Sequence, residues 1–199
     1  MKASPSSKRT FDDFNDYEHS LVTAKVLCKK FVDDVKAHPW SGGYCLSLCG
    51  KSGTGKTMLA EIVLSALGLN GWGNCDEIPE ALIAGALCKF TTHLFYMPKI
   101  SDQFKALRFG SIEEMIDQRF AVLDDIGADY DPSKITASKV DRVLRERKGK
   151  WTLVTFNLPL SEIAAKIDSR VASFIIRDDN RFVQIVADDY AKRKMNGNR

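Results

Sequence analysis

Short apolar runs alternate with longer amphipathic segments along most of this chain. The apolar runs have the length of buried strands, and they lie at residues 44–49, 92–97, 119–123, 151–156 and 182–186. Between them, apolar residues spaced three and four apart and runs of helix-forming residues predict helices. The predicted helices lie at residues 21–35, 58–67, 80–89, 99–108, 111–118, 131–148 and 160–173. Such alternation is typical of an α/β fold, in which helices cover both faces of a parallel sheet.

A glycine-rich loop joins the first predicted strand to the helix that follows it. Residues 50–57 have the pattern G-x-x-x-x-G-K-T, which forms a P-loop when it lies between a strand and a helix. Backbone N–H groups and the helix N-terminus then bind phosphate. A glycine turn that merely connects the two elements is the alternative, and the full match in this context argues against it. We expect ATP to contact Gly50, Lys51, Ser52, Gly53, Thr54, Gly55, Lys56, Thr57 and Met58.

Three side chains are candidates for the chemistry around the terminal phosphates. Lys56 is expected to reach the β- and γ-phosphates, and the Thr57 hydroxyl to hold Mg²⁺. The third predicted strand ends in Asp124 and Asp125, and open α/β sheets bind ligands at the carboxyl ends of their strands. We assign Asp124 to Mg²⁺ and Asp125 to activation of the attacking water. Carboxylates often simply end strands at the surface, but the P-loop upstream favours the catalytic interpretation.

The fourth predicted strand ends in Asn157. This side chain lies beside the γ-phosphate if the fourth strand runs between the first and the third. It could then position the phosphate or the attacking water. An asparagine also suits the turn before Pro159 for conformational reasons alone, and the spacing leaves both interpretations open.

Composition places bounds on the class of protein. A length of 199 residues suits one α/β domain, and the net charge of +3 is too small to indicate nucleic-acid binding by itself. The five cysteines form no C-x-x-C pair, and with three histidines they argue against a zinc site or a disulfide framework. No apolar run approaches the roughly 18 residues of a membrane span, and residues 1–10 lack the apolar segment of a signal peptide. We expect a cytoplasmic protein that does not contact membranes.

Positive charge gathers on and just past the predicted helix at 131–148. The basic residues there are Lys134, Lys139, Arg142, Arg145, Arg147, Lys148 and Lys150, and a second group consists of Lys99, Lys105 and Arg108. A face of this kind suits contacts with the backbone of single-stranded DNA. A solvated helix face balanced by Asp141 and Glu146 is equally compatible with the charges. The candidate DNA contacts are Lys99, Lys105, Arg108, Lys139 and Arg142.

Four motifs together resemble those of the AAA+ ATPases. They are the P-loop, Leu-Asp-Asp-Ile-Gly at residues 123–127, Thr-x-Asn-Leu-Pro-Leu at 155–160 and Asp-Ser-Arg-Val at 168–171. Their order and spacing are most similar to those of the DnaC-like helicase loaders and the related IstB-like transposition ATPases. The resemblance implies a P-loop NTPase of the AAA+ type with a parallel five-stranded sheet in the order 5-1-4-3-2. It also implies helices on both faces and little or no C-terminal lid domain.

The resemblance also implies an organisation of the chain and the roles of two residues. It gives residues 11–190 as the ATPase domain. By their composition, residues 1–10, rich in Ser, Lys and Pro, are expected to be disordered, and residues 191–199 to be a basic tail. Asn157 becomes a sensor of the γ-phosphate. Arg170, otherwise a solvated helix residue, becomes an arginine finger that reaches the nucleotide of a neighbouring subunit. Such a contact implies self-association into a ring or spiral.

One departure from the family pattern lies after the last predicted strand. That group often carries an arginine here, in Asp-x-Tyr-Arg or Asp-x-Trp-Arg, and this chain has Ala191 at the corresponding position. The arginine that acts on the nucleotide from this segment is therefore missing or moved.

We expect a DnaC-like ATPase that acts in DNA replication, binds single-stranded DNA and loads or remodels a replicative helicase. An IstB-like helper of a transposase, working on duplex DNA, is the alternative within the same fold. A P-loop kinase of small molecules is the alternative from another class, and it leaves Asn157 and Arg170 without roles.

Overall fold

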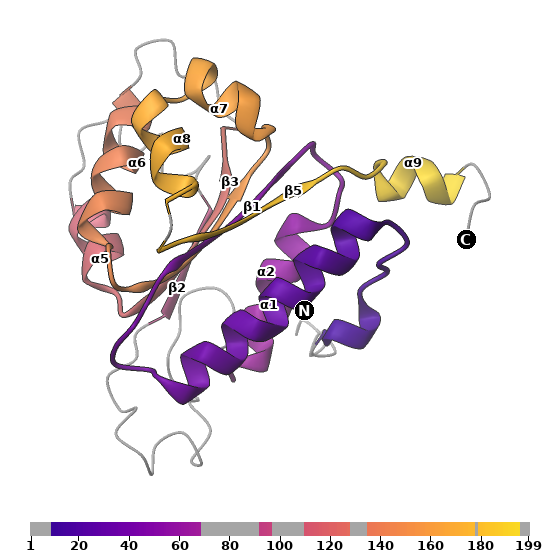
Figure 1. The fold of residues 1–199 in the computed structure, drawn as a ribbon, viewed down its shortest axis with the longest axis horizontal. Coiled ribbons are helices and arrows are strands. Elements are labelled where there is room, and N and C mark those ends of the chain that lie inside the picture. The colour runs from indigo at the N-terminus through magenta and orange to yellow at the C-terminus, as the bar shows by residue number, and fades with distance from the viewer. Residues whose placement is uncertain (1–8, 69–91, 97–109, 128–134, 178, 196–199) are drawn as a thin grey trace, which may run out of the picture.

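A parallel sheet of five strands, in the order β2-β3-β4-β1-β5, lies at the centre of the molecule (Figure 1). The computed structural model describes residues 9–68, 92–96, 110–127, 135–177 and 179–195. The strands are β1 (Cys45–Gly50), β2 (Thr92–Tyr96), β3 (Phe120–Ile126), β4 (Trp151–Phe156) and β5 (Arg181–Ile185). Read from the other edge, this is the predicted order 5-1-4-3-2, so the prediction is confirmed.

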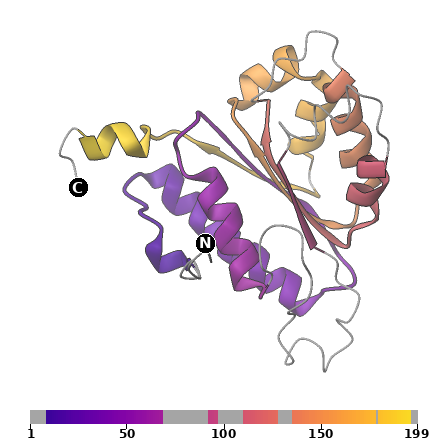
Figure 2. The ribbon, with the colours of Figure 1, turned by 180° about the vertical axis from the view of Figure 1, so that it is seen from behind.

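Helices cover both faces of the sheet, as predicted (Figures 1 and 2). On one face lie α1 (His19–Ala37) and α2 (Lys56–Ala66). On the other face lie α5 (Gly110–Asp117), α6 (Ile135–Glu146), α7 (Leu160–Lys166) and α8 (Ser169–Ile175). The short helices η1 (Phe11–Asp13) and α9 (Tyr190–Met195) flank these layers at the two ends of the described chain.

The central strand β1 shows how the sheet supports two cores. Its six residues are all buried, and successive side chains of a strand point to opposite faces. Leu46 and Leu48 belong to the core under α1 and α2, whereas Cys45 and Cys49 belong to the core on the other face. The thiols are free, and burial raises the pKa of Cys45 to about 11 and that of Cys49 to about 12. They therefore act as small apolar side chains.

The helix predicted at residues 160–173 is divided into α7 and α8. Asp168 lies between them in an extended conformation and accepts a hydrogen bond from the backbone N–H of Arg170. An aspartate that caps the next helix in this way competes with continuation of the preceding one. The break fixes where α8 begins, and therefore where Arg170 lies.

Several predictions fall wholly or partly outside the described residues. The helices predicted at 80–89 and 99–108 lie outside them, as does the first part of the helix predicted at 131–148. The expected basic tail begins within α9, which is helical through Met195. Among the helices that the structure describes, none is long and apolar enough to cross a membrane.

Arg147 is a buried cation where α5, β4 and the end of α6 meet, with 2 % of its surface exposed. Its guanidinium donates hydrogen bonds to the carbonyl oxygens of Met115, Gln118 and Trp151 at 2.6, 2.7 and 2.8 Å, and to Thr152 Oγ1 at 3.0 Å. Burial lowers the pKa of Arg147 to about 10. The carbonyl groups at the end of α5 carry the partial negative charge of that helix terminus. Arg147 therefore ties α5 to the sheet and is not part of an exposed basic face.

We predict that Arg147→Met lowers the free energy of unfolding by about 3 kcal/mol, because it leaves several buried oxygen atoms without a donor. Denaturation in urea measures this loss. The matched control is Arg142→Met, on α6, whose exposed side chain pairs with Glu113 and Glu146. That change should cost less than about 1 kcal/mol. Equal losses in the two variants would contradict the anchoring role of Arg147.

Candidate nucleotide-binding site

The P-loop leaves β1 at Gly50 and enters α2 at Lys56. Gly53 and Gly55 adopt φ angles of +78° and +88°, which side chains rarely tolerate. A Cβ atom on Gly55 would lie 2.9 Å from the Phe14 ring, so the close approach of that ring also requires glycine. These two glycines turn the chain so that the loop and the first turn of α2 line one cavity.

The cavity has a volume of about 490 Å³ and brings together most of the predicted site residues. The predicted site residues that line the cavity are Ser52, Gly53, Thr54, Gly55, Lys56, Thr57, Met58, Asp125 and Asn157. Gly50 is buried at the end of β1, Lys51 is exposed beside a second cavity, and Asp124 is buried behind Thr57. The N-terminal and C-terminal segments add Phe14, Tyr17, Asp189 and Tyr190, none of which was among the predicted site residues.

Lys56 is held inside the loop, with 4 % of its surface exposed. Its Nζ donates a hydrogen bond of 2.7 Å to the carbonyl oxygen of Lys51 and lies 3.5 Å from Thr54 Oγ1. Burial lowers the pKa of Lys56, and the charges of Asp125 and Asp124 oppose that shift. A buried ammonium group that lines a cavity beside backbone N–H groups suits a phosphate ligand.

Thr57 and Asp124 face one another across the start of α2 and the end of β3. The Thr57 hydroxyl donates to the two carboxylate oxygens of Asp124 at 3.2 and 3.1 Å. Burial raises the pKa of Asp124, and hydrogen bonds from Thr155 and Thr57 oppose the shift. Mg²⁺ binds to such oxygen atoms and completes its shell with phosphates and water. The hydroxyl and carboxylate oxygens of this pair therefore fit Mg²⁺.

An irregularity in β3 directs the two neighbouring carboxylates. The register between β3 and β4 shifts between Leu123 and Ile126, and Asp125 has a φ of 67°. In a regular strand, Asp124 and Asp125 would point to opposite faces, but a bulge changes their directions. Asp124 therefore reaches Thr57, while Asp125 accepts a hydrogen bond from Asn157 Nδ2. A left-handed aspartate costs on the order of 1 kcal/mol and commonly marks a functional site.

Thr155 connects the two carboxylates and was not identified from the motifs. Its hydroxyl donates to Asp124 Oδ1 at 2.7 Å and accepts from the backbone N–H of Asp125 at 2.8 Å. Thr155 is fully buried on β4. A buried hydroxyl in an apolar strand needs a partner, and this was the available signal in the sequence. The partner could not be named without the order of the strands.

The C-terminal segment packs against the P-loop. The backbone N–H of Tyr190 donates to the Gly53 carbonyl oxygen at 3.0 Å. The Asp189 carboxylate caps α9 through the N–H groups of Ala191 and Lys192. Ala191 lines the cavity, and the Arg193 guanidinium lies 3.6 Å from the centre of the Tyr17 ring.

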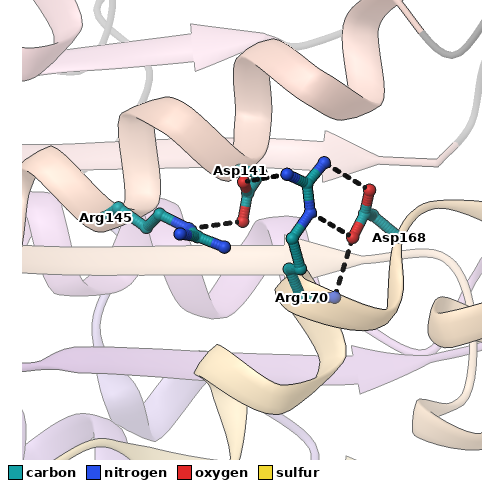
Figure 3. A network of polar contacts seen from close by, with 4 residues as sticks. All are labelled: Asp141, Arg145, Asp168 and Arg170. Atoms are coloured by element: carbon teal, nitrogen blue, oxygen red, sulfur yellow. Dashed lines mark hydrogen bonds and ion pairs between the residues drawn. The ribbon is translucent and has the colours of Figure 1, made fainter.

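The other predicted residues lie away from the cavity. Arg170, on α8, is not among the described residues that line it, and it binds Asp168 and Asp141 (Figure 3). On α6, Lys139 is half-buried and Arg142 pairs with Glu113 and Glu146. Lys99, Lys105 and Arg108 lie outside the described residues.

We predict that Gly53→Ala weakens ATP binding at least about tenfold, or about 1.4 kcal/mol. The added Cβ would lie 2.3 Å from Asp189 Oδ2, so the loop and the capped α9 could not keep their contact. Titration with a fluorescent ATP analogue measures the effect. Gly42→Ala is the matched control, since Gly42 also has a positive φ of +68° but no described atom within 4 Å of the added Cβ. Equal weakening in both variants would show that backbone strain alone is responsible.

This chain is similar in structure to several proteins of known structure. Neither the protein-family models nor the curated protein sequences contain a match to this chain. The DnaC helicase loader has a similar structure with a TM-score of 0.65 and 21 % identity, over 89 % of this chain and 96 % of that one. DnaI is similar with a TM-score of 0.61 and 16 % identity, over 92 % of this chain and 90 % of that one.

The replication initiator DnaA bound to AMPPCP and single-stranded DNA is also similar, with a TM-score of 0.63 and 14 % identity. The match covers 96 % of this chain and 56 % of that protein. At these identities the similarity concerns the fold. This chain therefore has a fold similar to those of the DnaC helicase loader and of DnaA, with the strand order that the resemblance to AAA+ ATPases predicts.

Proposed function

We propose that this chain binds ATP and Mg²⁺, hydrolyses ATP and acts in DNA replication by loading or remodelling a replicative helicase on single-stranded DNA. The observation that carries the proposal is the meeting of three groups at the carboxyl ends of β1, β3 and β4. These groups are the P-loop, the Thr57–Asp124 pair and the Asn157–Asp125 pair. The similarity in fold to DnaC, a helicase loader, and to DnaA with single-stranded DNA supports the choice of pathway.

The residues of the cavity have complementary roles in this proposal. The P-loop N–H groups and Lys56 bind and orient the phosphates, while Thr57 and Asp124 hold the metal ion. When bound, Mg²⁺ supplies positive charge that offsets the charge developing on the phosphates. Asp125 accepts a proton from the attacking water. Asn157 fixes the orientation of the Asp125 carboxylate through its hydrogen bond.

We predict that Asp125→Asn retains ATP binding and loses turnover by about 100-fold or more, the range for a missing general base. Lys56→Ala should instead lose ATP affinity. Binding of a fluorescent ATP analogue and release of phosphate, each with and without single-stranded DNA, separate the two defects. Asp179→Asn is a matched control, because Asp179 is exposed and pairs with Lys148 at 3.7 Å.

Two results would contradict this part of the proposal. Turnover of Asp125→Asn at the rate of the unmodified protein would remove water activation from Asp125. Transfer of phosphate to small acceptors in place of water would indicate a kinase.

Arg170 is proposed to act on the nucleotide of a neighbouring subunit. Its side chain is 54 % exposed and lies outside the cavity of its own subunit. A residue that acts in trans requires a head-to-tail contact between copies, which closes into a ring or continues as a spiral. Each active site then lies between two subunits.

We predict that mixing two inactive variants restores hydrolysis. Arg170→Ala subunits keep Lys56, and Lys56→Ala subunits keep the finger, so a mixed contact contains one complete site. Arginine fingers contribute on the order of 10³-fold or more in rate, which makes restored phosphate release easy to measure. The control is each variant alone at the same total concentration. A mixture that assembles but remains as inactive as its components would show that Arg170 does not act in trans.

Contact with single-stranded DNA is proposed for the basic residues of α6 and of the segment before α5. Arg142 pairs with two exposed carboxylates, and such exposed pairs contribute little stability. A DNA phosphate could therefore replace them at low cost. Arg147 is buried and takes no part in this surface.

A further inference from the structure

The guanidinium of Arg170 pairs with two carboxylates of its own subunit, Asp168 and Asp141 (Figure 3). Its Nε and Nη2 atoms donate to the two oxygens of Asp168 at 3.0 and 2.9 Å. Its Nη1 atom lies 3.5 Å from Asp141 Oδ2, on the neighbouring helix α6. All three nitrogen atoms of the side chain therefore face a negative charge.

The two carboxylates hold Arg170 in different ways. Asp168 caps α8 and also accepts from the backbone N–H of Arg170 at 2.7 Å, so it moves together with Arg170. Asp141 belongs to another helix and makes one longer contact with Arg170. A shift of α8 relative to α6 would keep the Asp168 contacts and break the Asp141 contact.

Asp141 occupies the side of the guanidinium that a phosphate would need. Asp168 covers the edge formed by Nε and Nη2, so an external anion would approach the edge formed by Nη1 and the second N–H of Nη2, where Asp141 contacts Nη1. A guanidinium paired with two carboxylates has little positive charge left to offer an external phosphate. The Asp141 contact must therefore be released before Arg170 can stabilise charge elsewhere.

Arg145 provides a partner for Asp141 after that release. Its Nε donates to Asp141 Oδ1 at 2.9 Å, on the oxygen that Arg170 does not use. The Asp141 side chain is 8 % exposed, and a carboxylate so nearly buried is costly to leave unpaired. With Arg145 in place, Asp141 can lose Arg170 and still be paired.

We propose that Asp141 restrains Arg170 in the isolated subunit. On assembly, the contact between Arg170 Nη1 and Asp141 is exchanged for a contact with a phosphate of the neighbouring subunit's ATP. Arg145 then retains Asp141. Asp141 thereby sets the subunit concentration at which hydrolysis begins. The inference rests on the proposed action of Arg170 in trans.

The test is the rate of ATP hydrolysis per subunit as a function of protein concentration. Asp141→Asn removes the charge with little change in shape. It should lower the concentration for half-maximal rate about two- to fivefold, because the Arg170 side chain of the pair is 54 % exposed and solvent screens the contact. The maximal rate per subunit should not change. Glu162→Gln is the control, since it removes another ion-paired carboxylate, one that pairs with Lys166 on α7. It should leave both values unchanged.

Arg145→Gln provides a second test, in which the concentration for half-maximal rate should change in the opposite direction. It tests the same inference if Asp141→Asn does not fold. Without Arg145, the exchange leaves Asp141 with no guanidinium, so the half-maximal concentration should rise. In the background of Arg170→Ala, Asp141→Asn should not change the concentration at which the subunits assemble, measured by sedimentation. Thermal unfolding of each variant separates these effects from a loss of stability.

Three results would overturn the inference. If Arg170→Ala loses turnover but Asp141→Asn leaves the half-maximal concentration unchanged, Arg170 acts in trans and Asp141 does not restrain it. If Asp141→Asn lowers the maximal rate, Asp141 positions Arg170 for catalysis. If Arg170→Ala hydrolyses ATP at the rate of the unmodified protein, the trans role itself fails, and the restraint fails with it.

Discussion

The hydroxyl group of Thr155 is the point on which the candidate site depends. It connects the carboxylate of Asp124 with the backbone of Asp125, and it comes from the neighbouring strand β4. Because both of its hydrogen bonds are used, the bulge at the end of β3 is fixed relative to β4. Asp124 can then face Thr57 at the start of α2, and Asp125 can face Asn157 at the end of β4. One buried side chain thus fixes the relative positions of Asp124, the proposed metal ligand, and Asp125, the proposed base.

The two faces of the sheet have different parts in the proposed function. The core under α1 and α2 supports the P-loop, and the N-terminal and C-terminal segments enclose the cavity from that side. The other face carries α6 and α8, which hold the network around Arg170 (Figure 3). Buried Arg147 lies just past α6 and secures that region to α5 and β4. Because α6 is fixed, Asp141 has a defined position. A movement of α8 would therefore change the distance between Asp141 and Arg170.

Predictions that depended on contiguous residues agree with the structure. The P-loop is a run of neighbouring residues, and Gly53 and Gly55 in it adopt left-handed conformations. Strands β1 to β5 form where apolar runs were found. In β1, β3 and β4, side chains buried on both faces give a nearly continuous apolar signal. The predicted helix at 160–173 was wrong in one respect: a single capping aspartate divides it, and periodicity does not reveal a cap within an apolar pattern.

The sequence by itself determined the fold class, the position of the P-loop and the residue types available at the ends of the strands. Local spacing decides these features, since a helix, a strand or a glycine turn depends on residues close together in the chain. The resemblance to AAA+ proteins supplied the strand order. Tertiary structure decided which side chains meet: Thr155 with Asp124, Tyr190 with Gly53 and Asp141 with Arg170. It also buried Arg147, which the charge pattern had placed among exposed basic residues. These contacts join residues far apart in the chain, so they depend on register and helix packing, which no local pattern encodes.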